Sequence, residues 1–246
     1  MTAKGISIKF KSYGESIKKV LDLIKLNSEL KNHESIVIKP WLNGEEHNTK
    51  KDIIEEIIKY CLAHKKNDAE IVIAEGVEGK NTIEIFENLG YKELAEKYGV
   101  GLVDLNTSEI EEIFNGEFIK FDYIKYPRLL KNSFIISVPE LSVDDEMGMV
   151  GSISNMVGAF PSRYYSGFFS SYKNKIRKWP IKYSIHDIVR CKMPSLAIID
   201  ASKKGYLIVG KPLEMDVQAS KILELDKVGY LKLFEEEIQD NSDKKE

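Results

Sequence analysis

The sequence predicts a single α/β domain with a mostly parallel sheet, helices on both faces and a basic aromatic insertion between the late strands. From Glu34 onward, short β-branched runs alternate with helical patterns, and this alternation is typical of βαβ units. The 246 residues include 43% apolar and 30% charged side chains, enough for a full core. This composition excludes disordered, collagen-like and coiled-coil chains.

The first half of the chain supplies most of the predicted βα pairs. In chain order we expect strand 6–10, helix 15–30, strand 35–38, helix 49–63, strand 70–74, helix 81–89 and strand 100–105. Within the second helix, Ile53, Ile54 and Ile57 recur at helical spacing, with charged residues on the other faces. That helix should therefore cover one side of the sheet.

The pattern loosens in the second half. We expect a strand at 117–121, a buried strand at 133–138, a helix capped by Ser184 and a last central strand at 195–199. Residues 240–246 form a charged terminus and should be disordered. With no internal repeat or low-complexity linker, residues 1–239 are assigned to one domain.

Several classes of protein are disfavoured by simple features. The longest apolar runs fall far short of the roughly 18 residues that a membrane helix needs. Residues 1–10 lack a secretory pattern, so we expect a cytoplasmic protein. Cys61 and Cys191 are too few and too far apart to ligate an iron–sulfur cluster, and we expect no such cluster.

Ligands of open parallel sheets bind beyond the carboxyl ends of the strands, where loops and helix N-termini converge. Lys39 and Glu75 end two predicted strands and should face one crevice if those strands are neighbours. Glu75 is the best candidate for a general base, hence for a catalytic residue. The candidate substrate-binding residues are Lys39, Asn43, Thr49, Lys80, Asn155 and Arg163.

The loop from Gly76 to Lys80 is only superficially similar to a phosphate loop. The nucleotide-triphosphatase pattern has four residues between its glycines and a Ser or Thr after the lysine, whereas here two residues separate Gly76 from Gly79 and Asn81 follows Lys80. The alternative is a tight turn in which Asn81 caps the next helix, with Glu84 completing a capping box. Lys80 remains a candidate anion ligand, because a lysine at a helix N-terminus is electrostatically misplaced without a negative neighbour.

A metal could be held only by a small set of oxygen ligands. The histidines and cysteines show no zinc-binding spacing. Asp200 and Asp216 are the candidates for a divalent cation such as magnesium, which requires only one or two carboxylates. For each, a helix cap or a surface carboxylate is the alternative. The cofactor is otherwise unknown.

Residues 147–186 carry the strongest charge asymmetry of the chain. They contain six basic and no acidic residues, while the rest of the chain has 30 basic and 39 acidic residues. Aromatic residues are interleaved with the charges, and Gly148, Gly151 and Gly158 precede them. We interpret the segment as a glycine-hinged lid over an anionic ligand, with aromatics packed on the sheet as the alternative. A nucleic-acid surface is disfavoured because six charges make a small footprint.

An ordered series of short elements resembles the family known as domain of unknown function 362 over residues 35–232. The elements are Val37-Ile38-Lys39-Pro40, Thr49, Ile73-Ala74-Glu75-Gly76, Thr82, Leu89-Gly90-Tyr91, Val103-Asp104-Leu105-Asn106, Ile136-Ser137-Val138-Pro139, Asn155 to Gly158, Pro194 to Asp200 and Leu213 to Ala219. The family lacks an agreed activity. Its members often carry ferredoxin-like iron–sulfur modules, and this chain does not contain the cysteines for one.

The chain also departs from the usual family pattern. Trp41 stands where the family usually has asparagine, and Ser154 where a lysine usually precedes the asparagine. Residues 140–145 replace a Lys-Thr-His element, and Ala201 replaces a glycine. The loss of two basic groups and a histidine indicates a divergent paralogue with another ligand, or a catalytically silent one.

These observations predict an enzyme or former enzyme that binds a small anionic metabolite at the strand ends. The alternative is a non-catalytic binding or assembly protein that uses residues 147–186 to meet a protein or nucleic-acid partner. Whether the chain is an enzyme, and which reaction it would catalyse, is left open by the sequence.

Overall fold

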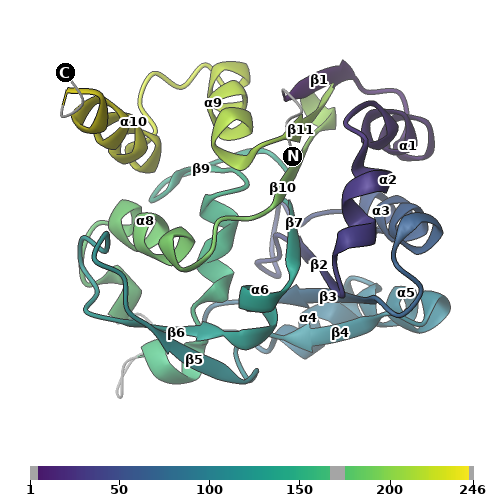
Figure 1. Ribbon diagram of the computed structural model, residues 1–246, viewed down its shortest axis with the longest axis horizontal. Helices are drawn as coiled ribbons and strands as arrows, with labels where there is room; N and C mark the ends of the chain where they lie inside the picture. The colour runs from purple at the N-terminus through teal and green to yellow at the C-terminus, as the bar shows by residue number, and fades with distance from the viewer. Residues whose placement is uncertain (1–4, 167–174, 244–246) are drawn as a thin grey trace.

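The computed structural model describes residues 5–166 and 175–243, which form one α/β domain (Figure 1). Within this described part, seven strands make one sheet in the order β1-β11-β10-β7-β2-β3-β4. The strands are β1 (Ile6–Lys9), β2 (Ser35–Pro40), β3 (Glu70–Glu75), β4 (Gly101–Asp104), β7 (Phe134–Val138), β10 (Leu196–Ala201) and β11 (Tyr206–Gly210). The predicted fold class is confirmed.

Five neighbouring strands of the sheet are parallel. β10 pairs with β7, β7 with β2, β2 with β3 and β3 with β4, all in parallel register. β11 is antiparallel to β10, and β1 is antiparallel to β11. The carboxyl ends of β2, β3 and β7 therefore lie together at one edge.

Helices cover both faces of the sheet, and Figure 1 shows α1 to α3 on one side and α8 to α10 on the other. The helices are α1 (Tyr13–Leu23), α2 (Leu26–Glu29), α3 (Lys51–His64), α4 (Thr82–Asn88), α5 (Tyr91–Tyr98), α6 (Arg128–Asn132), α7 (Ser162–Tyr165), α8 (Ile181–Cys191), α9 (Pro212–Ile222) and α10 (Gly229–Asp243). Short 3₁₀ turns are η1 (Leu30–Asn32), η2 (Ser154–Ala159), η3 (Lys175–Arg177) and η4 (Ser202–Lys204).

Alternate residues of each central strand enter opposite cores. In β2, Ile36 and Ile38 belong to the same core as Ile53 of α3, whereas Val37 belongs to a second core that includes Ile185 of α8. This period of two follows from the pleat of the strand. Because both faces are covered, the central strands are apolar on both sides, as their continuous β-branched sequence predicts.

Two sequence predictions about local structure were wrong. The helix predicted at 15–30 is interrupted at Lys25, which has φ 57° and separates α1 from α2. The strand predicted at 117–121 does not form; β5 (Ile110–Ile113) and β6 (Ile124–Pro127) form a hairpin around it. The backbone N–H groups of residues 119–121 instead donate to the buried carboxylate of Asp187, which takes the place of a strand partner.

The ends of two helices also differ from the predictions. Ser184 does not cap α8; it lies inside the helix and its hydroxyl donates to the Ile176 carbonyl. α10 continues to Asp243, so the tail predicted to be disordered at 240–246 begins within a helix, and residues 244–246 lie outside the described part. None of the helices in the described part is long and apolar enough to cross a membrane.

Candidate functional site

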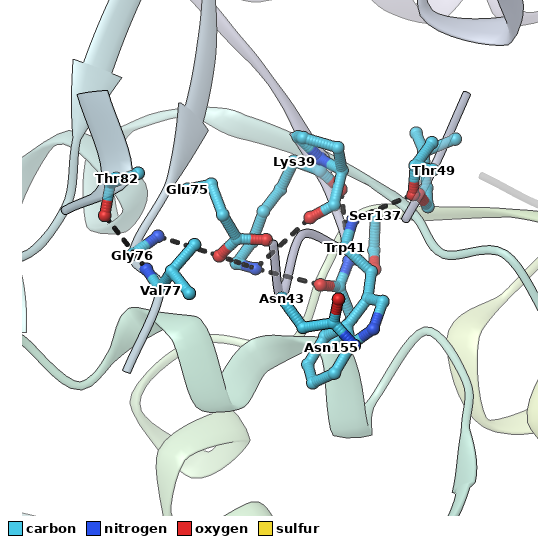
Figure 2. Close-up of polar contacts among 12 residues, drawn as sticks. Lys39, Trp41, Asn43, Thr49, Glu75, Gly76, Val77, Thr82, Ser137 and Asn155 are labelled. Carbon is cyan, nitrogen blue, oxygen red and sulfur yellow. Dashed lines mark hydrogen bonds and ion pairs between the residues drawn. The ribbon is translucent and has the colours of Figure 1, made fainter. Parts of the chain in front are cut away.

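Lys39 and Glu75 meet at the carboxyl edge of the sheet, because β2 and β3 are parallel neighbours. Lys39 Nζ donates to Glu75 Oε1 at 2.6 Å, and Figure 2 shows the two side chains converging with Asn155. Both side chains are buried, with 0% and 1% of their surface exposed. The two residues share one site, as the order of the strands predicts, while their roles stay predictions.

Asn155 of η2 completes this buried cluster. Its side-chain oxygen accepts a hydrogen bond from Lys39 Nζ at 2.9 Å. Its side-chain nitrogen donates to the Lys39 carbonyl at 3.0 Å and to Ser137 Oγ of β7 at 2.9 Å. Asn155 therefore joins the 147–186 segment to two strands of the sheet, and the lysine is oriented by an amide that is itself fixed.

Burial dominates the ionisation of the Lys39–Glu75 pair. Removal from water raises the pKa of the Glu75 carboxyl and lowers the pKa of the Lys39 ammonium, and each group opposes the other's shift. The backbone N–H of Gly76 donates to Glu75 Oε1 at 2.8 Å. Glu75 Oε2 is buried but has no hydrogen-bond partner in the described part. Oε1 thus has two hydrogen-bond donors, Lys39 Nζ and Gly76 N–H, while Oε2 has none among the described residues; the Leu42 N–H also favours the charged carboxylate and lowers its pKa.

Gly158 allows the chain to pack directly against this pair. A Cβ added at Gly158 would overlap Glu75 Oε1 and lie 2.9 Å from Lys39 Nζ. Gly158 and Gly151 are both buried. The predicted hinge role of these two glycines is therefore replaced by a packing role: they permit close approach to buried side chains.

A cavity of about 580 Å³ opens above the pair, between the loops that follow β2 and β3, the hairpin of β8 (Ser142–Asp144) and β9 (Gly148–Val150), and η2. Glu75 lines it. The remaining wall consists of Trp41, Leu42, Asn43, Glu45, Gly76, Val77, Glu78, Gly79, Lys80, Asp144, Glu146, Met147, Val157, Gly158, Phe160, Ile176 and Arg177. A cavity of this size fits a small molecule.

The cations on the described wall of the cavity are already paired. Lys80 Nζ lies 2.5 Å from Glu45 Oε1 and donates to the Asn43 carbonyl at 2.8 Å. Arg177 forms ion pairs with Glu78, at 2.7 Å, and with Glu146. The 147–186 segment contains no carboxylate of its own, but Arg177 is paired, because Glu78 and Glu146 lie outside the segment and reach it in the fold.

Of the other predicted binding residues, Asn43 and Lys80 line the cavity, whereas Thr49 and Arg163 do not. Thr49 is buried; its hydroxyl donates to the Val138 carbonyl at 2.6 Å and accepts from Trp41 N–H, which closes the loop after β2. Arg163 is exposed and donates to the Ser108 carbonyl at 3.1 Å. Both are better explained by loop structure than by ligand contact.

The glycine loop after β3 is a capped turn. Asn81 Oδ1 accepts from the N–H groups of Ile83 and Glu84, so the predicted capping role of Asn81 is confirmed. Thr82 Oγ1 accepts from Val77 N–H at 3.0 Å. The predicted anion-binding role of Lys80 has no support, because Glu45 provides its negative neighbour.

The oxygens of the two predicted metal ligands are engaged by protein donors. Asp200 accepts from Tyr13 Oη at 2.7 Å and from Ser202 N–H at 3.0 Å. Asp216 lies on α9 and accepts from two backbone N–H groups and from Tyr230 Oη. No group of three or more His, Cys, Asp or Glu side chains in the described part could hold a metal ion. The structure gives no support to a divalent cation at Asp200 or Asp216.

Much of the 147–186 segment is core. Met149, Met156, Phe160, Tyr165 and Ile185 are buried in the second core. Among the aromatic residues between the charges, Tyr165 is buried and Tyr164 packs against this core, as the alternative interpretation predicts for them. Residues 167–174 lie outside the described part. The predicted lid, and the partner surface predicted as its alternative, therefore concern at most the exposed parts of this segment, and both stay predictions.

Sequence reasoning missed several residues that shape the site. Ser137 accepts a hydrogen bond from the side chain of Asn155, and Gly158 leaves room for the side chain of Glu75. The cavity wall is acidic because it includes Glu78, Asp144 and Glu146. A polar Ser137 within an otherwise apolar strand was the available signal. The acidic residues gave no signal, because their neighbours come from distant parts of the chain.

Taken together, the fold and the cavity define an α/β protein with a small-molecule pocket at the carboxyl ends of a parallel sheet. The family model for the domain of unknown function (DUF362) matches residues 36–230, and the chain belongs to this family. The resemblance seen in the sequence is confirmed. No curated protein matches the chain.

Proposed function

We propose that the protein binds a small molecule in the cavity above Lys39 and Glu75 and exchanges a proton with it, as an enzyme or a former enzyme. One observation supports this proposal above the others: a buried carboxylate lines the cavity with one free oxygen while its other oxygen is fixed by a lysine. Perturbed titratable groups in a cleft are the usual mark of a functional site.

The pair has the chemistry for proton transfer. Burial disfavours the charged form of both groups, so the difference between the pKa values of Glu75 and Lys39 is smaller than in water. A proton taken by Glu75 Oε2 from a bound molecule would be stabilised by burial. Glu75 is then the proposed base, and Lys39 and Asn155 are the residues that position it.

The anionic ligand expected from the sequence stays a prediction, and the described wall does not favour it. That expectation depended on free cations, but Lys39, Lys80 and Arg177 each contact a carboxylate. A cytoplasmic location likewise remains a prediction of the sequence.

The proposal can be tested with the two tryptophan indole N–H signals in a ¹H–¹⁵N NMR spectrum. Trp41 lines the cavity and Trp179 does not, and Trp41→Phe assigns the two signals. In a screen of small polar fragments, binders should shift the Trp41 signal and should compete with one another. Fragments that shift only the Trp179 signal, or a screen without any binder, would count against the proposal.

Glu75→Gln provides the matched variant for proton transfer. Gln keeps an oxygen for Lys39 and Gly76 but cannot accept a proton at the free position. For any binder found, affinity should depend on pH in the parent protein and much less in Glu75→Gln. Glu93→Gln, an exposed substitution on α5 outside the cavity, should behave as the parent.

A further inference from the structure

The cavity has a charge that does not match an anionic occupant. Its described wall includes five acidic residues, Glu45, Glu75, Glu78, Asp144 and Glu146, and two basic ones, Lys80 and Arg177. Even with buried Lys39 added, acidic groups outnumber basic groups. An anion entering this cavity would meet a net negative potential and would have to displace existing ion pairs.

We propose that the natural ligand is an organic cation, an amine whose ammonium group donates to the free Oε2 of Glu75. This inference rests on the proposed small-molecule pocket and specifies its ligand class. The carboxylate is 1% exposed, and its second oxygen has no hydrogen-bond partner in the described part. A buried acceptor without a donor is costly, so an ammonium N–H would satisfy it and place a charge where the wall is acidic.

The rest of the wall favours an organic cation over a metal ion. A hard cation such as Ca²⁺ takes six or more oxygen ligands and Mg²⁺ an octahedral set, and no suitable group of side chains exists in the described part. Trp41 and Phe160 bring aromatic rings to the cavity, together with the apolar side chains of Met147 and Val157. Aromatic faces attract ammonium groups, and apolar side chains accommodate the carbon skeleton that carries the charge.

Ion pairs and hydrogen bonds hold the acidic side chains of the cavity wall in place. Arg177 joins Glu78 of the loop after β3 to Glu146 of the β8–β9 hairpin. Asp144 Oδ1 accepts the N–H groups of Glu146 and Met147 at 3.0 and 2.7 Å, which fixes the turn of that hairpin. Asp144, which lines the cavity, therefore carries its charge on a side chain that two hydrogen bonds hold in place.

The test compares three probes of similar shape and different charge: benzylammonium, benzyl alcohol and benzoate. Binding is followed by the fluorescence of Trp41 in a Trp179→Phe protein, where Trp41 is the only tryptophan. We expect benzylammonium to bind roughly tenfold more tightly than benzyl alcohol, and benzoate more weakly than the alcohol. Asp144→Asn should reduce this preference, since asparagine keeps the oxygen that accepts from Glu146 and Met147 but removes the charge.

Glu75→Gln should abolish the preference for benzylammonium over the alcohol, and Glu93→Gln should leave it unchanged. Because Glu75→Gln removes the partner of a buried lysine, Asp144→Asn keeps the inference testable if that variant fails to fold. Equal binding of the three probes, or tighter binding of benzoate, overturns the cationic ligand while the small-molecule pocket stands. If no probe alters Trp41 fluorescence, the cationic ligand is overturned, and the fragment screen decides separately whether the pocket exists.

Discussion

Two buried carboxylates illustrate how the same group serves different purposes in this fold. Glu75 and Asp216 are both almost fully buried, and burial raises the pKa of each. Asp216 Oδ1 accepts from Ser152 N–H at 2.7 Å, and its Oδ2 accepts from Ile153 N–H at 3.0 Å and from Tyr230 Oη at 2.9 Å. Glu75, which lines a cavity, instead accepts hydrogen bonds at one oxygen, and its other oxygen has no hydrogen-bond partner in the described part.

The difference in hydrogen bonding distinguishes a structural carboxylate, Asp216, from a candidate functional one, Glu75. Asp216 is fully engaged by neutral donors and anchors the turn before η2 to α9 and α10, so it has nothing left to offer a ligand. Glu75 is paired with a cation and keeps one unsatisfied oxygen, and an unsatisfied buried group requires an explanation. Burial alone therefore does not identify a site; incomplete hydrogen bonding next to a cavity does.

The largest expected effect follows from breaking the Lys39–Glu75 pair. Lys39→Ala should lower the free energy of unfolding by about 3–5 kcal/mol, because it leaves Glu75 and Asn155 without their buried partner. Urea denaturation at neutral pH measures this. The double variant Lys39→Met/Glu75→Gln should lose less, since no uncompensated charge remains. A loss no larger than that of an exposed lysine would show that Lys39 serves ligand binding rather than the fold.

Asp216 should contribute to the pH dependence of stability. The pKa of Asp216 is about 6 in the folded protein, whereas the ordinary value for an aspartate is 3.8. The folded state therefore binds this proton more tightly than the unfolded state does. Stability from this group is therefore highest at low pH, falls as pH rises from about 4 to about 6, and is constant above that. Asp216→Asn lacks this titration.

The comparison of Asp216→Asn with the parent protein isolates this contribution. The free energy of unfolding of the variant minus that of the parent should increase by roughly 3 kcal/mol across the window, since each pKa unit corresponds to about 1.4 kcal/mol. Urea denaturation at several pH values provides the measurement. A difference that stays constant with pH would mean that Asp216 is ionised as readily in the folded state as in the unfolded state.

Each carboxylate packs against a glycine, which allows a matched pair of substitutions. A Cβ at Gly151 would lie 2.6 Å from Asp216 Oδ2, and one at Gly158 would overlap Glu75 Oε1. Gly151→Ala and Gly158→Ala should each cost about 1–3 kcal/mol by overpacking. Among variants that remain folded, only Gly158→Ala should also alter the binding of probes followed by Trp41 fluorescence. An equal effect of both on binding would remove the distinction between the two carboxylates.

The smallest effect is expected at the exposed lysine of the cavity wall. Lys80 contacts Glu45 at the surface, where solvent and salt screen the ion pair. Lys80→Ala should leave the midpoint of urea denaturation unchanged within error, in contrast to Lys39→Ala. It should also strengthen the binding of benzylammonium, because it removes a positive charge from the wall. Weaker binding would instead show that Lys80 contacts the ligand.

The sequence by itself determined the class of fold and most of the strands and helices in the first half of the chain, and it predicted that Lys39 and Glu75 would meet if their strands were neighbours. These features depend on local patterns: β-branched runs mark buried strands, Asn81 marks a helix start, and consecutive βα units favour adjacent parallel strands. The same local reasoning failed at residues 117–121, where a β-rich pattern forms no strand because the carboxylate of distant Asp187 binds the backbone.

Only the tertiary structure decided which charges are available. Residues 147–186 contain no acidic residue, and the sequence therefore implied free cations, yet Arg177 contacts Glu78 from another part of the chain. The hydrogen bonds that engage Asp216, and the free oxygen of Glu75, likewise depend on residues far apart in sequence. Electrostatic interactions act through space and not along the chain, so the fold determines whether a charged residue faces a partner or a ligand.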